Sequence, residues 1–237
     1  MILITGASSG LGAAVAKQYA EQGHALLLTG RSQERLQKTL ASCRLAAPEF
    51  ADNNTCIQSL SCELSQDESV EQLIEKIHEM EADGQMLAKV IHCAGSGYFG
   101  ELEKQQPQAI RELIDNNVTS TIMLLQQLVM HFKHKPIKLV VVMSTAALSG
   151  KAGETTYCAA KWAARGFVES LRLELKGLPM KLIAVYPGGM DTGFWPTSGK
   201  HVDTSSFMSA DEAATMLIQA LPATEHGYVA DLTIQRG

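Results

Sequence analysis

The sequence lacks the features of several specialised protein classes. No run of apolar residues approaches the roughly 18 that a membrane-spanning helix requires. The five cysteines are scattered and never spaced as CxxC, a pattern that indicates neither a disulfide framework nor a zinc site. Basic residues number 20 against 25 acidic ones and form no cluster. We therefore expect no membrane, no nucleic acid and no metal among the binding partners.

Signals for export and for several domains are also missing. The first apolar segment follows no positively charged region and no small-residue cleavage site, and unpaired cysteines suit a reducing compartment. A cytoplasmic location is therefore expected. The 237 residues contain no internal repeat, low-complexity tract or linker. Because a chain of this length buries one sizeable core, we expect residues 1–237 to form one domain.

Segments with strand character alternate with segments of helical periodicity. The expected strands are Met1–Thr5, Ala25–Thr29, Thr55–Ser61, Lys89–Cys93, Lys138–Ser144, Lys181–Tyr186 and Tyr228–Ile234. In the first expected helix, Leu11, Val15 and Tyr19 recur every fourth residue. This alternation predicts an α/β fold, a Rossmann-like, doubly wound parallel sheet of about seven strands with helices on both faces.

Other segments have weaker or mixed signals. Ser209 and Glu212 form a capping-box pattern that predicts the start of the last helix. A long helix is expected from about Pro107 to His134, and another begins near Tyr157. Two stretches have no clear periodicity, Ala46–Asn54 and Asp191–Met208. The second is long enough to suggest a functional loop.

A glycine-rich turn follows the first expected strand. Residues 5–12 read TGASSGLG, with glycines at positions 6, 10 and 12. Glycine allows close approach of the backbone, and the N-terminus of the following helix attracts the pyrophosphate of a dinucleotide. A tight strand-to-helix turn that binds no ligand is the alternative.

The end of the second expected strand indicates which dinucleotide would bind. Gly30 occupies the position where a Rossmann unit that prefers NAD has an acidic residue, and Arg31 follows it. A guanidinium can bind a 2′-phosphate through two hydrogen bonds. The sequence therefore predicts NADP(H) in preference to NAD(H). In the alternative interpretation, Arg31 is a solvated residue that pairs with Glu34.

A tyrosine and a lysine lie four residues apart at Tyr157 and Lys161, and so on one face of a helix. A free phenol titrates near ~10, and a neighbouring cation favours its ionised form. Lys161 is therefore expected to lower the pKa of Tyr157 and to make it an acid/base group. Taken alone, this spacing is equally typical of a partly buried tyrosine beside a solvated lysine.

Several motifs occur together in an order that resembles the short-chain dehydrogenase/reductase family. They are the Thr5–Gly12 loop, Ala94-Gly95, Asn117, Ser144, Tyr157, Lys161 and the Pro187-Gly188 turn, and they span nearly the whole chain. Ser144 lies thirteen residues before Tyr157, which is the interval that the family uses.

The resemblance implies a set of site residues. Ser144 and Tyr157 would bind the substrate oxygen, Lys161 would hold the nicotinamide ribose, and Asn117 would bind a water that relays protons. The implied catalytic residues are Asn117, Ser144, Tyr157 and Lys161. The implied cofactor-binding residues are Gly6, Ser8, Ser9, Gly10, Leu11, Gly12, Arg31, Glu63, Leu64, Ala94, Gly95, Tyr157, Lys161, Pro187, Gly188 and Thr192. Similar proteins pair two long helices with those of a second subunit, so a homodimer or homotetramer is expected.

Two positions depart from the family pattern. His92-Cys93 replaces the usual Asn-Asn, and we interpret His92 as a structural substitute, with a catalytic histidine as the alternative. Glu63 stands where the family commonly has an aspartate beside the adenine. His131 and His134 could be read as a metal pair, but a solvated cationic helix end is favoured because no carboxylate or cysteine is nearby in sequence.

Residues 189–209 correspond to the mobile substrate lid of the family. Within them, Phe194, Trp195 and Phe207 either cover an apolar substrate pocket, which we favour, or anchor the loop. The expected function is NADP(H)-dependent hydride transfer to or from a small carbonyl or alcohol substrate. The alternatives are an NADP(H)-binding redox sensor without catalysis, which the intact Ser144, Tyr157 and Lys161 argue against, and epimerase or lyase chemistry.

Overall fold

The main sheet has seven strands in the order β3-β2-β1-β4-β5-β6-β9, and all neighbours are parallel. The computed structural model describes residues 1–47, 56–222 and 227–236. The strands are β1 (Ile2–Thr5), β2 (Leu26–Gly30), β3 (Ile57–Ser61), β4 (Lys89–His92), β5 (Lys138–Val142), β6 (Lys181–Pro187) and β9 (Asp231–Ile234). This arrangement confirms the predicted doubly wound sheet.

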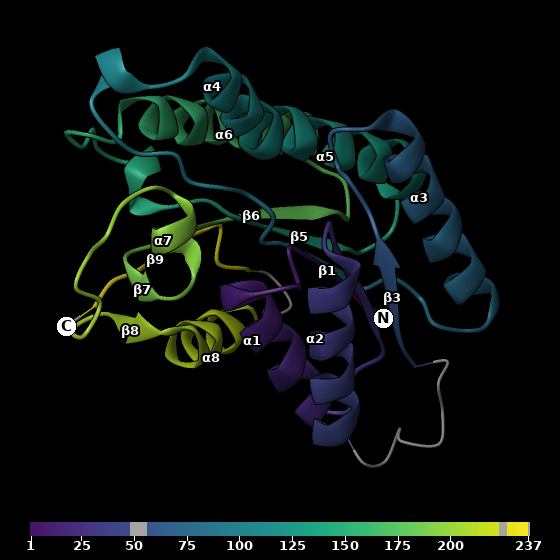
Figure 1. Cartoon of the computed structure of the whole chain (residues 1–237). Coiled ribbons are helices and arrows are strands. Elements are labelled where there is room, and N and C mark those ends of the chain that lie inside the picture. The colour runs from purple at the N-terminus through teal and green to yellow at the C-terminus, as the bar shows by residue number, and fades with distance from the viewer. Residues whose placement is uncertain (48–55, 223–226, 237) are drawn as a thin grey trace.

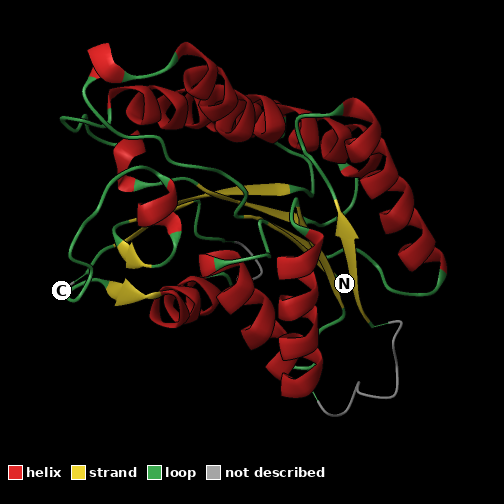
Figure 2. Cartoon of the chain, in the orientation of Figure 1, coloured by secondary structure: helices red, strands yellow, loops and turns green. Residues whose placement is uncertain are grey.

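Helices cover both faces of the sheet (Figures 1 and 2). One layer contains α3 (Asp67–Ala82), α4 (Pro107–Ile114), α5 (Ser120–Phe132) and α6 (Thr155–Glu174). The other contains α1 (Gly10–Glu21), α2 (Gln33–Ala46) and α8 (Ala210–Ala220). Successive strand residues alternate between the layers, since Leu3 packs into the first core and Ile2 and Ile4 into the second.

The sequence signals for α1 and α8 are confirmed. Leu11, Val15 and Tyr19 are all buried on the face of α1 that packs against the sheet. Ser209 Oγ accepts a hydrogen bond from the Glu212 N–H at 3.1 Å, and the Glu212 carboxylate accepts one from the Ser209 N–H at 2.7 Å. This is the predicted capping box.

The long helix predicted from Pro107 to His134 is interrupted. A π-helical turn, η3 (Asp115–Thr119), separates α4 from α5, and the helix ends at Phe132. A π turn contains one more residue than an α turn, so it changes the direction in which its side chains point, and it often occurs at functional sites. Asn117 lies at its centre. The unbroken helix was therefore a wrong prediction at the position that matters most for the site.

Several predicted strand ends also shift. The last strand begins at Asp231 rather than Tyr228, and β5 ends at Val142, so Ser144 lies just beyond the strand. Asp191–Met208 is more than a loop, because Met190–Asp191 (β7) pairs in parallel with Met208–Ser209 (β8), and α7 (Phe194–Thr197) lies between them.

Two further short turns complete the described elements, η2 (Leu102–Lys104) and η4 (Thr145–Ala147). Of the unassigned stretch Ala46–Asn54, residues 48–54 lie outside the described residues. No helix in the described parts of the chain combines the length and the apolar composition needed to cross a bilayer.

The strand order places a crevice at the carboxyl ends of the central strands. The chain proceeds outward from β1 to β3, then returns to place β4 on the other side of β1. In sheets of this kind, ligands bind beyond the carboxyl ends of the strands where the order reverses. The segments that follow β1 and β4 are the glycine-rich turn and the Cys93–Gly95 segment, so both predicted motifs meet at this crevice.

Candidate active site

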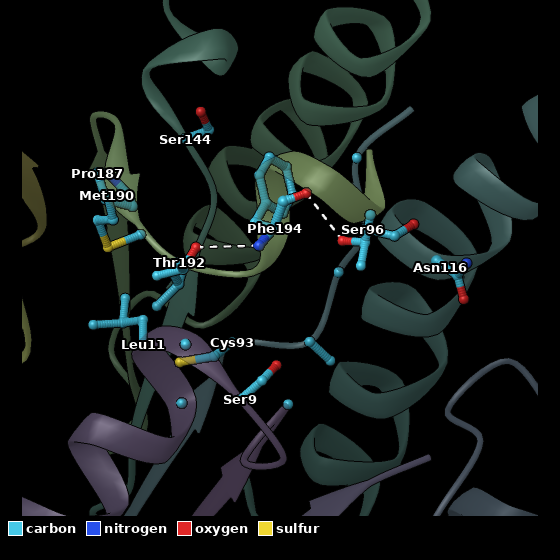
Figure 3. A pocket seen from close by; sticks show the side chains of 18 of the residues that line it. Ser9, Leu11, Cys93, Ser96, Asn116, Ser144, Pro187, Met190, Thr192 and Phe194 are labelled. Atoms are coloured by element: carbon cyan, nitrogen blue, oxygen red, sulfur yellow. Dashed lines mark hydrogen bonds between the residues drawn. The ribbon is translucent and has the colours of Figure 1, made fainter. Parts of the chain in front are cut away.

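A cavity of about 590 Å³ lies at the carboxyl ends of the strands. Figure 3 shows Ser9 and Leu11 at the start of α1, with Thr192 and Phe194 above them. Every predicted cofactor-binding residue lines the cavity, as do the predicted catalytic residues Ser144, Tyr157 and Lys161. Lining residues that the sequence did not reveal include Thr29, Arg35, Cys93, Ser96, Asn116, Thr145, Lys151 and Glu154.

The glycine-rich turn is built so that only glycine fits at two of its positions. Gly6 has a φ of +65°, and a Cβ there would lie 2.7 Å from the Ala94 nitrogen. A Cβ on Gly12 would lie 2.4 Å from the Gly6 carbonyl oxygen. Ser9, the N-cap of α1, forms no side-chain capping bond. The first N–H groups of α1 therefore remain available to an anion in the cavity.

Arg31 reaches across the cavity from the end of β2. Its Nη1 donates a hydrogen bond to Asn116 Oδ1 at 2.9 Å and lies 3.6 Å from the Glu63 carboxylate. The alternative pairing with Glu34 does not occur, since Glu34 pairs with Lys38 at 2.7 Å. Asn116 comes from the π turn, far from Arg31 in sequence, so no local pattern could have identified it.

Tyr157 and Lys161 lie one turn apart on α6 and are both buried. The Lys161 ammonium is 5.6 Å from the centre of the Tyr157 ring. The pKa of Tyr157 is raised rather than lowered, contrary to the prediction. Burial raises this pKa, and a hydrogen bond with Ser144 opposes the shift only in part. Burial also lowers the pKa of Lys161 to about 8. The sequence revealed the neighbouring cation but not the degree of burial.

Ser144 caps the short turn η4 that follows β5. Its Oγ accepts a hydrogen bond from the Ala146 N–H at 3.1 Å, which fixes the hydroxyl beside Tyr157. The serine, the tyrosine and the lysine thus meet from two elements that are separated in the sequence.

Asn117 lies behind the cavity wall rather than on it. Its Nδ2 donates to the carbonyl oxygens of Ser96 and Leu113, both at 2.9 Å, while its Oδ1 is buried and has no partner. A Cβ at Gly95 would lie 2.8 Å from this Oδ1 and 3.2 Å from Lys161 Nζ. Gly95 therefore leaves open the space between an unsatisfied acceptor and the lysine.

A comparison with protein families assigns the chain to a family whose motifs line this cavity. The model of the short chain dehydrogenase family matches residues 1–203. The chain belongs to this family. Among its curated relatives, 3-ketodihydrosphingosine reductase from Mus musculus is 26% identical over 193 residues, which is 81% of this chain. The chain spans 56% of the length of that relative and of its Bos taurus counterpart.

Two solved structures are also similar to this chain. A short-chain dehydrogenase/reductase from Vibrio parahaemolyticus has a TM-score of 0.86 and 45% identity, with 100% of both chains covered. An alcohol dehydrogenase from Thermococcus sibiricus, solved with 5-hydroxy-NADP, has a TM-score of 0.83 and 26% identity over 98% of this chain and 94% of that one.

His92 occupies a position where short-chain dehydrogenases commonly have asparagine. It is buried, with Nδ1 2.8 Å from Thr5 Oγ1 and Nε2 2.9 Å from Thr121 Oγ1. Thr121 Oγ1 in turn donates to the Asn117 carbonyl at 2.9 Å. The imidazole thus links β1 to the segment that carries Asn117. Burial lowers the His92 pKa to about 3, which keeps the ring neutral. These contacts support the structural interpretation.

Cys93, the second departure from the family pattern, also lines the cavity (Figure 3). Burial raises the pKa of its thiol to about 12. The thiol is therefore protonated at neutral pH and contributes a small, weakly polar wall rather than a nucleophile.

Residues 189–209, the predicted lid, border the cavity beside Tyr157. The Phe194 and Tyr157 ring centres are 5.9 Å apart, and Phe194 and Trp195 both line the cavity. Phe207 instead packs on Trp195, with ring centres 5.5 Å apart, and against Gly189. The predicted pocket role therefore applies to two of the three aromatic residues, and Phe207 anchors the loop.

His131 does not pair with His134. Its Nδ1 lies 3.2 Å from His78 Nε2, which links α5 to α3. Within the described residues, no group of three or more histidine, cysteine, aspartate or glutamate side chains is placed to hold a metal ion.

Proposed function

We propose that this protein is an NADP(H)-dependent oxidoreductase that acts on a carbonyl compound or secondary alcohol, with Tyr157 as the general acid and base. The observation that supports it most directly is that one cavity joins the glycine-rich turn to Ser144, Tyr157 and Lys161. When bound, the nicotinamide cofactor supplies or accepts the hydride, and the proton that accompanies it must come from a side chain.

The residues of the glycine-rich turn fit the pyrophosphate of a dinucleotide. The turn leaves no room for side chains at Gly6 and Gly12, and the start of α1 offers N–H groups that have no partner within the helix. Thr192 lies against this turn, since a Cβ at Gly10 would be 3.6 Å from its methyl group. Thr192 and the turn would therefore hold neighbouring parts of the same cofactor.

The burial of Tyr157 keeps its phenol in the protonated form that a proton donor needs. Because burial raises its pKa, the phenol is protonated at neutral pH and can donate to a substrate oxygen. The Ser144 hydroxyl would orient that oxygen, and the Lys161 ammonium would stabilise the phenolate that forms. A water between Lys161 and the unsatisfied Asn117 Oδ1 would return the proton from solvent.

NADP(H) is proposed in preference to NAD(H). Arg31 and Arg35 both line the cavity beyond β2, where the adenosine ribose is expected. The Glu63 carboxylate lies 3.6 Å from Arg31, but both side chains are partly exposed, so this ion pair is easily exchanged for a phosphate.

The protein is also proposed to form a homo-oligomer and to reside in a reducing compartment. Of the apolar residues on α5 and α6, Leu125 and Leu171 are buried within the chain, whereas Ile122 and Trp162 are 38% and 48% exposed. These exposed side chains suit a contact with a second copy. The five cysteines are all unpaired, which suits the cytoplasm. Light scattering of the purified protein tests the oligomer directly.

Substitution of Tyr157 tests the proposed chemistry. Tyr157→Phe should reduce NADPH-dependent turnover of ketones by roughly 10²- to 10⁴-fold while NADPH still binds. Tyr186→Phe is the matched control, because Tyr186 is buried on β6 and bonds Asp231 outside the cavity. Undiminished turnover by Tyr157→Phe would refute the acid/base role. Tight NADPH binding without turnover of any ketone would favour a sensor.

A further inference from the structure

The catalytic end of the cavity has an aromatic wall. Phe99 packs edge to face on Tyr157, with ring centres 5.2 Å apart, and Phe194 approaches the same ring from the lid. Trp195 completes the wall through contacts with both phenylalanines. Figure 3 shows Phe194 reaching over the cavity. A substrate that replaces these ring contacts must present an apolar or aromatic surface of its own.

A cation lies at the edge of this apolar region. Lys151 lines the cavity, and its Nζ donates a hydrogen bond to Thr145 Oγ1 at 3.2 Å. Thr145 directly follows Ser144 in the chain and both line the cavity, so the ammonium group lies at the same end of the cavity as Ser144. None of the ion pairs found among the described residues includes Lys151.

The carboxylate of Glu154 does not neutralise Lys151. Glu154 also lines this end of the cavity, but its side chain is only 8% exposed and pairs with Lys200 of the lid at 3.0 Å. Glu154 and Lys200 therefore cancel each other, and Lys151 contributes one uncompensated positive charge. The Lys151 hydrogen bond to Thr145 Oγ1 leaves the charge without an anionic partner among the described residues, and the proposed proton-donating residues do not use it.

We infer that the substrate is an oxo acid, a carbonyl compound with an apolar or aromatic body and a carboxylate that binds Lys151. This inference rests on the proposed function and specifies its substrate class. Lys151 offers a carboxylate a cationic partner that the proposed catalytic residues do not use. Because Ser144, Thr145 and Lys151 all line the cavity, one molecule could present its carbonyl to Ser144 and its carboxylate to Lys151. The aromatic wall holds the remainder of the molecule.

A matched pair of substrates tests the inference. Benzoylformate and its methyl ester share a phenyl ring and a ketone, but only the first carries a carboxylate. We expect the wild-type protein with NADPH to have a kcat/KM about tenfold higher for the acid, which is the effect of a charged hydrogen bond at a partly exposed site. Because exposed charges are screened, the preference should decrease with added salt.

Substitutions then assign the preference to Lys151. Lys151→Met should bring the acid-to-ester ratio of kcat/KM close to one, and Lys151→Arg should restore much of it. Lys176→Met makes the same change of charge at the far end of α6, where Lys176 is exposed, and should keep the wild-type ratio. Circular dichroism would show that each variant is folded.

The outcomes separate this inference from the proposed function. If both ketones are reduced but the ratio is the same in the wild type and Lys151→Met, the oxo-acid inference is wrong and the reductase proposal stands. A wild-type preference for the ester would also overturn it. If no ketone in a broad panel is reduced, the proposed function fails, and the substrate class fails with it.

Discussion

Lys200 Nζ and the Glu154 carboxylate lie 3.0 Å apart, and this ion pair joins the lid to the start of α6. The lid has a second attachment, because the Ser198 carbonyl accepts a hydrogen bond from the Phe99 N–H at 2.9 Å. Lys200 Nζ also lies 5.6 Å from the centre of the Phe99 ring. The lid is therefore fastened to two separate segments that border the cavity.

Loss of this ion pair should loosen the lid. Lys200→Gln leaves a buried carboxylate without its partner, and because Lys200 is 41% exposed we expect a cost of about 1 kcal/mol in the free energy of unfolding. KM for a ketone should rise several-fold with a smaller change in kcat. Urea denaturation and steady-state kinetics measure the two effects. Lys38→Gln, which breaks an exposed pair with Glu34, is the control, and equal results for both variants would count against the lid attachment.

A methyl group at position 95 should disturb catalysis more than folding. In Gly95→Ala, the new Cβ would lie 2.8 Å from Asn117 Oδ1 and 3.2 Å from Lys161 Nζ, so the Asn117 amide must move and the lysine must shift slightly. We expect kcat to fall at least about tenfold, since small displacements of positioned groups are costly. Gly166→Ala on α6 has open space around its Cβ and should keep full activity with slightly higher stability. Normal kcat in Gly95→Ala would show that Lys161 tolerates displacement.

His92 should make stability depend on pH. Its pKa is lowered to about 3 in the fold and is near 6.5 in the unfolded chain, so its contribution is complete above pH 6.5 and is lost as the pH falls toward 3. The expected slope is about 1.4 kcal/mol per pH unit within that window.

Urea denaturation at several pH values tests this expectation. His92→Asn should flatten the curve between pH 4 and pH 6 relative to the wild type, at some cost in stability at pH 7. His134→Asn, at an exposed position after α5, should keep the wild-type slope. Identical slopes for His92→Asn and the wild type would mean that His92 accepts a proton in the folded protein.

Arg31 should determine the choice of cofactor. Arg31→Ala removes a guanidinium from the cavity, and we expect the Kd for NADPH to rise roughly 10- to 100-fold while the Kd for NADH changes little. Quenching of protein fluorescence measures both constants. Arg111→Ala, at an exposed position on α4, is the control. An equal rise for both dinucleotides would assign Arg31 a structural role through Asn116.

The parts of the site that sequence reasoning located are those with local signals. The glycine-rich turn could be located because Gly6 and Gly12 satisfy steric requirements within a few residues. Tyr157 and Lys161 could be located because one helix carries both. The order of strands and helices followed from hydrophobic periodicity in the same way. These signals were sufficient for the fold and for most of the cavity wall.

Features that depend on distant contacts were missed or wrong. Asn116 meets Arg31 across 85 positions of sequence. The π turn left the apolar periodicity of the surrounding helices intact, so no signal marked it. The direction of the Tyr157 pKa shift depends on burial by the lid and by Phe99, which the neighbouring lysine could not reveal. The unpaired charge of Lys151 likewise depends on a distant contact, because Glu154 pairs with Lys200 instead.

The short pairing of β7 with β8 has a consequence for how this protein could acquire new substrates. Met190 lies beside Met208 and Asp191 beside Ser209, so the two ends of the intervening segment are fixed to each other. A loop closed at its base can change in length at a small entropic cost. Insertions or replacements within residues 193–207 would thus reshape this end of the cavity while Thr192, Ser144, Tyr157 and Lys161 stay in place.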